Sequence, residues 1–135
     1  MGPSIRSLKT HRLSGVVVAS LLLTARSVAH AQLVDIGWDA SGGFERAFDV
    51  APGKFAELCG KLSKGQAVAW SFQSPEPLDF NIHYHAGKKV VFPARHGNTA
   101  ALEGELKVPV DHDYCWMWEN KAAAATTVTV KLRRR

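Results

Sequence analysis

The chain has 135 residues, with 17 Lys and Arg side chains, 12 Asp and Glu side chains and a formal net charge of +5 at pH 7. Four of the basic side chains fall in residues 1–31, so residues 32–135 carry 13 basic and 12 acidic groups. A nearly neutral body lacks the clustered positive charge that phosphate backbones require, so we expect no nucleic-acid partner.

Residues 1–31 have the pattern of an export signal. Basic side chains precede an uncharged apolar stretch at 13–23, which is too short to span a bilayer. Ala29-His30-Ala31 then has the small-x-small order that signal peptidase reads. We predict a cleavable signal peptide at 1–31 and a periplasmic or secreted mature form without a transmembrane span. A cut after Ala29 is the alternative, and it would leave His30 as a copper-binding first residue.

Period-two alternation of apolar and polar residues dominates the rest of the chain and predicts short β-strands. The predicted strands lie at 44–50, 56–62, 68–72, 78–84, 90–92, 102–108, 114–118 and 126–132. The first two are weaker, and 55–62 has one or two helical turns as its alternative. We predict a turn at 74–77, because two prolines interrupt a ladder, a tight turn at 86–88 and a loop at 93–101.

Seven or eight short strands and no helical pattern of ten or more residues predict an all-β fold. The expected architecture is an antiparallel β-sandwich, in which two sheets share one core. Residues 32–135 suit a single domain in length.

Both cysteines, Cys59 and Cys115, follow the predicted signal. In an oxidising compartment such a pair usually forms a disulfide, and closing this long loop would stabilise the fold by about 4 kcal/mol. Two buried free thiols are the alternative. A catalytic thiol is disfavoured because the chain has no Cys-x-x-Cys motif.

Three segments resemble the GOLD (Golgi dynamics) domain family. They are the aromatic strand 69–72 with the polar turn and strand 78–82 that follow it, the segment 114–120 from Tyr to Asn, and the closing strand 127–130. Together they cover roughly residues 47–132. The resemblance implies a jelly-roll-like sandwich that binds a protein or lipid partner and carries no catalytic residues. In cargo-receptor members the second cysteine falls at Met117, two residues after Cys115 and on the same strand face, so a bridge to Cys59 stays possible.

The segment His83-Tyr84-His85 is the sharpest candidate for chemistry. Residues two apart in a strand share a face, and Tyr84 belongs to the apolar set, so both imidazoles should lie on the polar face. Two such imidazoles can chelate copper or zinc. A third ligand is needed, and the candidates are His96, Asp111, His112 and Asp113, with Met117 for Cu(I). The alternative is that both histidines are ordinary polar residues of a solvated strand.

Trp116 and Trp118 share one face of their predicted strand, and Cys115 and Met117 share the other. If the cysteine face is inside, the two indoles form an aromatic platform for sugar rings or for a partner's apolar patch. If the cysteine face is outside, the two indoles lie in the core, and we expect a core position for at least one of them. Tyr114 should donate its hydroxyl back to the preceding turn, as in other sandwiches.

The sequence contains no nucleophile elbow, phosphate loop or metalloprotease helix, and its acidic pairs are expected to be solvated. We therefore expect an exported, non-catalytic binding or interaction module of the cell envelope, with a protein or lipid partner, and not an enzyme. One alternative is a copper- or zinc-binding envelope protein that uses the His-x-His strand. Another is an enzyme or enzyme accessory that acts on sugar.

Overall fold

The computed structural model describes Gly2 and residues 31–135, so the predicted signal peptide lies outside the described residues apart from Gly2 and Ala31. The described residues form strands and no helix, which confirms the all-β prediction. No segment of the described chain qualifies as a membrane-spanning helix. The strands are β1 (Gln32–Asp35), β2 (Gly43–Val50), β3 (Phe55–Leu62), β4 (Ala67–Ala86), β5 (Lys89–Lys107), β6 (His112–Glu119) and β7 (Thr126–Arg134).

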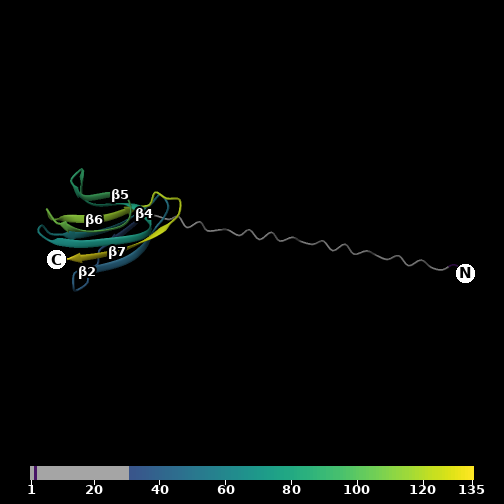
Figure 1. Cartoon of the computed structure of the whole chain (residues 1–135), viewed down its shortest axis with the longest axis horizontal. Helices are drawn as coiled ribbons and strands as arrows, with labels where there is room; N and C mark the ends of the chain where they lie inside the picture. Colours follow the sequence, from purple (N-terminus) through teal and green to yellow (C-terminus); the bar gives the residue numbers. More distant parts are fainter. Residues whose placement is uncertain (1, 3–30) are drawn as a thin grey trace.

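The strands build a β-sandwich whose two layers belong to one continuous sheet. The hydrogen-bonded order is β1-β3-β6-β4-β7-β2, and β5 pairs with β4. The second half of β4 pairs with β6 and its first half with β7, while β5 follows β4 through both halves. Figure 1 shows β5 and β6 along one side of the molecule and β7 and β2 along the other. The first layer is therefore β1, β3, β6 and the adjoining halves of β4 and β5, and the second layer is β2, β7 and the other halves.

Two long bent strands replace four of the shorter strands that the sequence predicts. The turn expected at 74–77 and the loop expected at 93–101 are both wrong, because β4 and β5 run through them. The pairing shifts between Gln73 and Leu78, and this irregularity accommodates the prolines while the strand bends from one layer to the other. β5 pairs only with β4, so Pro93 lies in an edge strand, where a missing N–H is tolerated.

Other predicted elements are confirmed. Segment 55–62 is a strand, so its helical alternative is wrong. The tight turn at 86–88 is present, and Gly87 has the positive φ of 62° that glycine adopts without strain. All strand pairs are antiparallel except β1 with β3, which are parallel.

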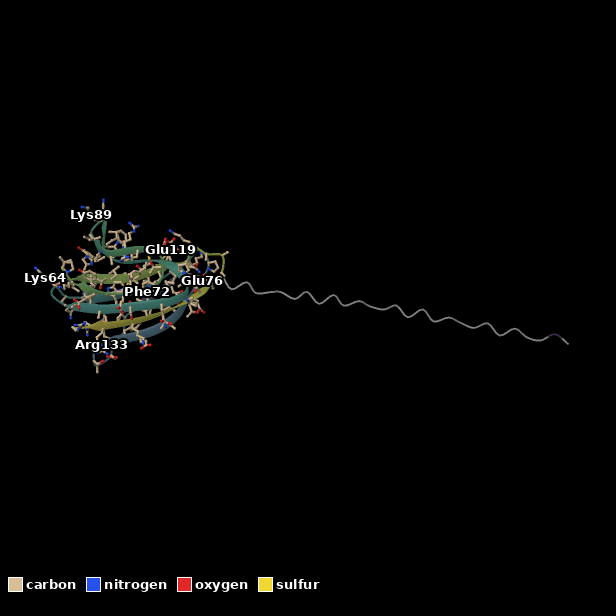
Figure 2. The ribbon with its side chains drawn as sticks, in the orientation of Figure 1. Lys64, Phe72, Glu76, Lys89, Glu119 and Arg133 are labelled. Atoms are coloured by element: carbon tan, nitrogen blue, oxygen red, sulfur yellow. A yellow bond between two sulfur atoms is a disulfide. The ribbon has the colours of Figure 1, made fainter. Side chains whose placement is uncertain are left out.

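The core lies between the layers and is rich in aromatic side chains. Trp116 and Trp118 are both 0% exposed, so the surface aromatic platform expected as one alternative is wrong. The cysteine face of β6 is the outer one, which turns both indoles inward. Trp118 packs against Phe72 and Phe80, with ring centroids 5.7 and 5.5 Å apart. Figure 2 shows Phe72 in the middle of the molecule, between the layers.

Side chains at both ends of β6 donate hydrogen bonds to backbone carbonyl oxygens of neighbouring segments. The Tyr114 hydroxyl donates to the Val110 carbonyl oxygen at 2.8 Å, as predicted, and burial raises the pKa of Tyr114. After the strand, the buried Asn120 amide donates to the carbonyl oxygens of Val50 and Ala124, at 2.9 and 2.8 Å. Asn120 thereby ties the end of the first layer to the end of β2 in the second.

Candidate functional site

The outer side of the first layer gathers the cysteines and one of the predicted histidines. Cys59 pairs in register with Cys115, and Cys115 pairs in register with His83, so the three side chains form a row across β3, β6 and β4. A disulfide joins Cys59 and Cys115, as the sequence predicts. The row lies at the centre of the layer, because β1 and β5 flank these three strands.

His83 is held in a fixed orientation by two side chains. Its Nε2 lies 2.9 Å from Glu57 Oε1, and its Nδ1 lies 2.8 Å from Asn81 Oδ1. Both distances are those of ordinary hydrogen bonds. The side chain is on the outer face, as predicted, but the residue is only 6% exposed and so is not solvated.

His85 and Phe92 lie beside His83 on the same face. The His85 ring centroid is 5.3 Å from that of His83, and His85 itself is exposed. The Phe92 ring centroid is 5.9 Å from the His83 ring, and the Arg95 guanidinium lies 4.5 Å from the Phe92 centroid. Phe92 and Arg95 thus shield His83 on the β5 side.

The other two predicted metal ligands lie elsewhere. The His96 ring stacks on Phe80 at 6.5 Å, and the His112 ring lies 5.3 Å from Tyr84. Phe80 and Tyr84 belong to the inward-facing set of β4, whereas His83 belongs to the outward-facing set. The predicted set of four histidines is therefore not brought together.

The structure instead groups His83 with two residues from neighbouring strands. Within the described part of the chain, Glu57, His83 and Cys115 are the group of potential metal ligands whose atoms lie within 4.8 Å of one another. The prediction missed Glu57. Its sequence signal was its place two residues before Cys59, which puts both on one face of β3.

Apolar side chains surround this group. Four of the five large hydrophobic side chains that are exposed in the described residues lie on the outer side of the first layer, and we name this surface the outer apolar face. Their positions follow from the pairing register: Leu33 opposite Glu57, Val90 opposite His85, Phe55 two residues before Glu57, and Phe92 against the His83 ring. The fifth, Val110, lies in the segment that precedes β6. Met117, half-buried, lies between Glu57 and Asn81 in the middle of the face.

An ion pair lies at one end of this face. Lys121 Nζ hydrogen bonds to Asp79, and the backbone N–H of Asn98 donates to the same carboxylate at 2.8 Å. The Lys121 ammonium, with this N–H, holds the pKa of Asp79 below its ordinary value, and Asp79 raises the pKa of Lys121 in turn.

The outer side of the second layer is different in character. A groove of about 700 Å³ crosses it, and small residues such as Ala69 and Ser71 contribute to its lining. Its charges are mixed: Lys131 Nζ lies 3.4 Å from Glu45, and an Arg135 nitrogen lies 3.6 Å from Glu105. Figure 2 shows Arg133 on this side of the molecule and Glu119, from the first layer, on the opposite side. The groove therefore combines charged side chains, four of which form two ion pairs, with an apolar lining from Phe44, Trp70 and Leu132.

No family model and no curated protein matches this chain. Among solved structures, it is similar to Aeromonas hydrophila PliG, a periplasmic lysozyme inhibitor of g-type lysozyme, with a TM-score of 0.63, 10% identity, and coverage of 78% of this chain and 98% of that chain. Salmonella Typhimurium PliG gives a TM-score of 0.59 at 15% identity, with coverage of 78% and 99%. The pre-peptidase C-terminal domain of a Bacillus anthracis collagenase gives 0.50 at 9% identity, with coverage of 82% and 99%.

At these identities the similarity establishes the fold and no more. The neighbours are β-fold proteins, in agreement with the sandwich predicted from the sequence. None of the three is a GOLD domain, and the resemblance to that family stays a prediction.

Proposed function

We propose that this chain is an exported, non-catalytic protein that binds another protein outside the cytosol through the outer apolar face. The observation that carries the proposal is the gathering of four of the five exposed large hydrophobic side chains on one side of one layer. Scattered surface hydrophobics need no explanation, but a shared face of them marks an interaction surface.

The make-up of the face fits a protein interface. Aromatic residues, methionine and arginine are enriched at such interfaces, and Phe55, Phe92, Met117 and Arg95 all belong to this face. The surface is also rigid, because the disulfide links β3 to β6 and the His83–Glu57 hydrogen bond links β4 to β3. Ordering this surface would therefore add little to the free-energy cost of binding a partner.

Charge favours a protein partner over a lipid surface. The strands of this face carry five carboxylates and two basic groups, and Lys121 at the end of the face adds a third basic group: Asp35, Glu57, Asp79, Asp113 and Glu119 against Lys61, Arg95 and Lys121. Anionic membranes attract basic surfaces, so an acidic excess opposes the lipid partner that the GOLD resemblance allows. The same excess suits a protein whose apolar patch is edged by Lys and Arg.

Lysozyme-type cell-wall hydrolases are the first candidate partners. This choice draws on the fold that the chain shares with two periplasmic inhibitors of g-type lysozyme. The predicted signal and the disulfide are consistent with the same compartment.

The test compares two valines with nearly equal exposure. Val90 on the outer apolar face is 43% exposed, and Val110 outside it is 41% exposed. Binding of g-type lysozyme and of other cell-wall hydrolases is titrated calorimetrically with Val90→Ser, Leu33→Ser and Val110→Ser. We expect the first two variants to lose affinity by roughly tenfold or more, as interface anchors do, and Val110→Ser to bind as the parent does.

Equal effects of Val90→Ser and Val110→Ser would reject the assignment of the face. The proposed function would be rejected by two results together: no cell-wall hydrolase binds the protein, and no envelope protein is captured in a way that depends on Val90 and Leu33.

A further inference from the structure

We propose that reduction of the Cys59–Cys115 disulfide creates a zinc site formed by Cys59, Cys115, His83 and Glu57. In the oxidised protein the ligand atoms of Glu57, His83 and Cys115 already lie within 4.8 Å of one another. Cys59 Sγ is bonded to Cys115 Sγ and so lies next to this group, although it is not within 4.8 Å of all three ligand atoms and has to turn toward them after reduction. The zinc proposal does not rest on the proposed protein partner, although the site lies within the outer apolar face.

The four residues come from three adjacent strands in the middle of the first layer. Cys59 pairs in register with Cys115, and Cys115 pairs with His83. Glu57 lies two residues before Cys59 on the same face of β3. A set of two thiolates, one imidazole and one carboxylate offers the four ligands of a tetrahedral zinc ion. Thiolates and imidazole together favour Zn²⁺ over Mg²⁺ or Ca²⁺.

His83 is already oriented as a zinc ligand. Its Nε2 lies 2.9 Å from Glu57 Oε1 and so points into the cluster, where a zinc ion would take the place of the proton that Nε2 donates to Glu57. Its Nδ1 is hydrogen bonded to Asn81 Oδ1 at 2.8 Å. Metal-bound histidines almost always engage their second ring nitrogen in this way, which fixes the tautomer and the ring plane. The residue is buried, so the ring does not need to be ordered on metal binding.

The disulfide blocks the site in the oxidised protein. A disulfide sulfur is not a thiolate, and zinc is bound by the thiolate form. Glu57 and His83 alone then offer two ligands, fewer than a stable zinc site requires. Bonds of roughly 2.0–2.3 Å to zinc place tetrahedral ligand atoms about 3.5 Å apart, so three of the ligands need to move by little more than about 1 Å and Cys59 needs a side-chain rotation once the disulfide is open.

Reduction needs an external phosphine or dithiol. A phosphine takes the oxygen of one water molecule, whose two protons go to the thiols, and leaves as the phosphine oxide. A dithiol breaks the sulfur–sulfur bond and supplies two electrons and two protons, which leaves two thiols on the protein and one disulfide on the reductant. Zn²⁺ then binds both sulfurs, and the two thiol protons pass to solvent.

The experiment uses the mature protein in oxidised form and in phosphine-reduced form, with the reductant removed under anaerobic conditions. Co²⁺ is the spectroscopic probe, and Zn²⁺ is the competitor. We expect the reduced protein to bind one equivalent of Co²⁺ with tetrahedral d–d bands and thiolate-to-cobalt charge transfer. The oxidised protein should bind at least about 100-fold more weakly, and Zn²⁺ should displace Co²⁺ from the reduced form.

Three variants test the ligand set. His83→Ala and Glu57→Gln should each lower the zinc affinity of the reduced protein by at least tenfold. His85→Ala is the matched control, because His85 shares the outer face with His83 but is not in the cluster, and its affinity should be unchanged. A loss in His85→Ala equal to that in His83→Ala would overturn the assignment.

Circular dichroism of the reduced, metal-free protein shows whether a change in zinc affinity comes from unfolding. If the reduced chain unfolds, the proposal requires that Zn²⁺ restore the β-sheet signal in the parent and not in His83→Ala. Equal affinity of oxidised and reduced protein, or zinc binding that does not depend on His83, would overturn the proposal.

Discussion

At Gly104 the backbone of β5 lies directly against the indole of Trp70. A Cβ on Gly104 would come within 2.6 Å of Trp70 Cζ2, an atom of a rigid ring. Gly104→Ala should therefore lower the free energy of unfolding by roughly 1–3 kcal/mol, the usual cost of overpacking, in a urea titration.

Gly37 provides the matched control, because nothing lies within 4 Å of a Cβ built there. Gly37→Ala should unfold at nearly the parent urea concentration. Equal midpoints for Gly104→Ala and Gly37→Ala would show that the indole moves aside without cost.

A carboxylate accounts for one pH dependence of stability at the residue scale. The Lys121 ammonium, together with the Asn98 N–H, lowers the pKa of Asp79 from 3.8 in the folded protein. A lowered folded pKa means that this contact stabilises the fold above about pH 4, and that its contribution is lost as pH falls through the folded pKa.

Asp79→Asn should accordingly reduce the free energy of unfolding at pH 7 by up to about 1 kcal/mol, the range for a partly exposed pair. The gap to the parent should close in urea titrations as the pH falls below 3.8. Lys121→Gln should show the same closing gap. A gap of constant size from pH 7 to pH 2 would mean that the ion pair is not its source.

At the scale of elements, the disulfide joins β3 to β6 across a sequence separation of 56 residues. A cross-link over a loop of this length restricts the unfolded chain, and its removal should cost about 4 kcal/mol on the chain-entropy model. Cys59→Ser with Cys115→Ser should show this loss in the free energy of unfolding, relative to the oxidised parent. Reduced parent protein without metal should behave like the double variant, and a loss below about 1 kcal/mol would contradict the prediction.

Sequence periodicity predicts a strand well where alternation is uninterrupted, as in β7. It fails in β4 and β5, because proline and glycine indicate a break in the sequence even when an edge strand or a pairing shift accommodates them. β1 is also missed, since four residues are too few for a period to show. Alternation defines which residues of β6 share a face, but it does not define which of the two faces is covered.

The same limit explains the outcome at the candidate site. The sequence predicts that His83 shares a face with His85, and that Cys59 and Cys115 are bonded. It does not predict that Glu57 and Asn81 hold the two nitrogens of His83, because the Glu57 contact depends on how β3, β6 and β4 are ordered in the sheet. His96 and His112 instead lie beside the aromatic rings of Phe80 and Tyr84 in β4.

At the scale of the molecule, the two outer faces point in opposite directions and differ in charge. The strands of the outer apolar face carry five carboxylates against two basic groups, whereas the groove on the second layer is lined by four carboxylates and three basic groups, with two ion pairs among them. A basic partner should therefore be attracted more strongly to the outer apolar face. Such steering acts mainly on the association rate and weakens as salt screens it, with a Debye length of about 10 Å at 0.1 M.

Two double variants with the same net charge separate this steering from a general charge effect. Asp35→Lys with Asp113→Lys changes the outer apolar face, and Glu45→Lys with Glu103→Lys changes the opposite groove. With a basic partner at low salt, stopped-flow measurement should give a several-fold slower association for the first pair and a much smaller change for the second. The difference should vanish near 1 M salt, where the Debye length is about 3 Å. Equal slowing by both pairs would mean that net charge alone acts, and that the partner does not approach the outer apolar face.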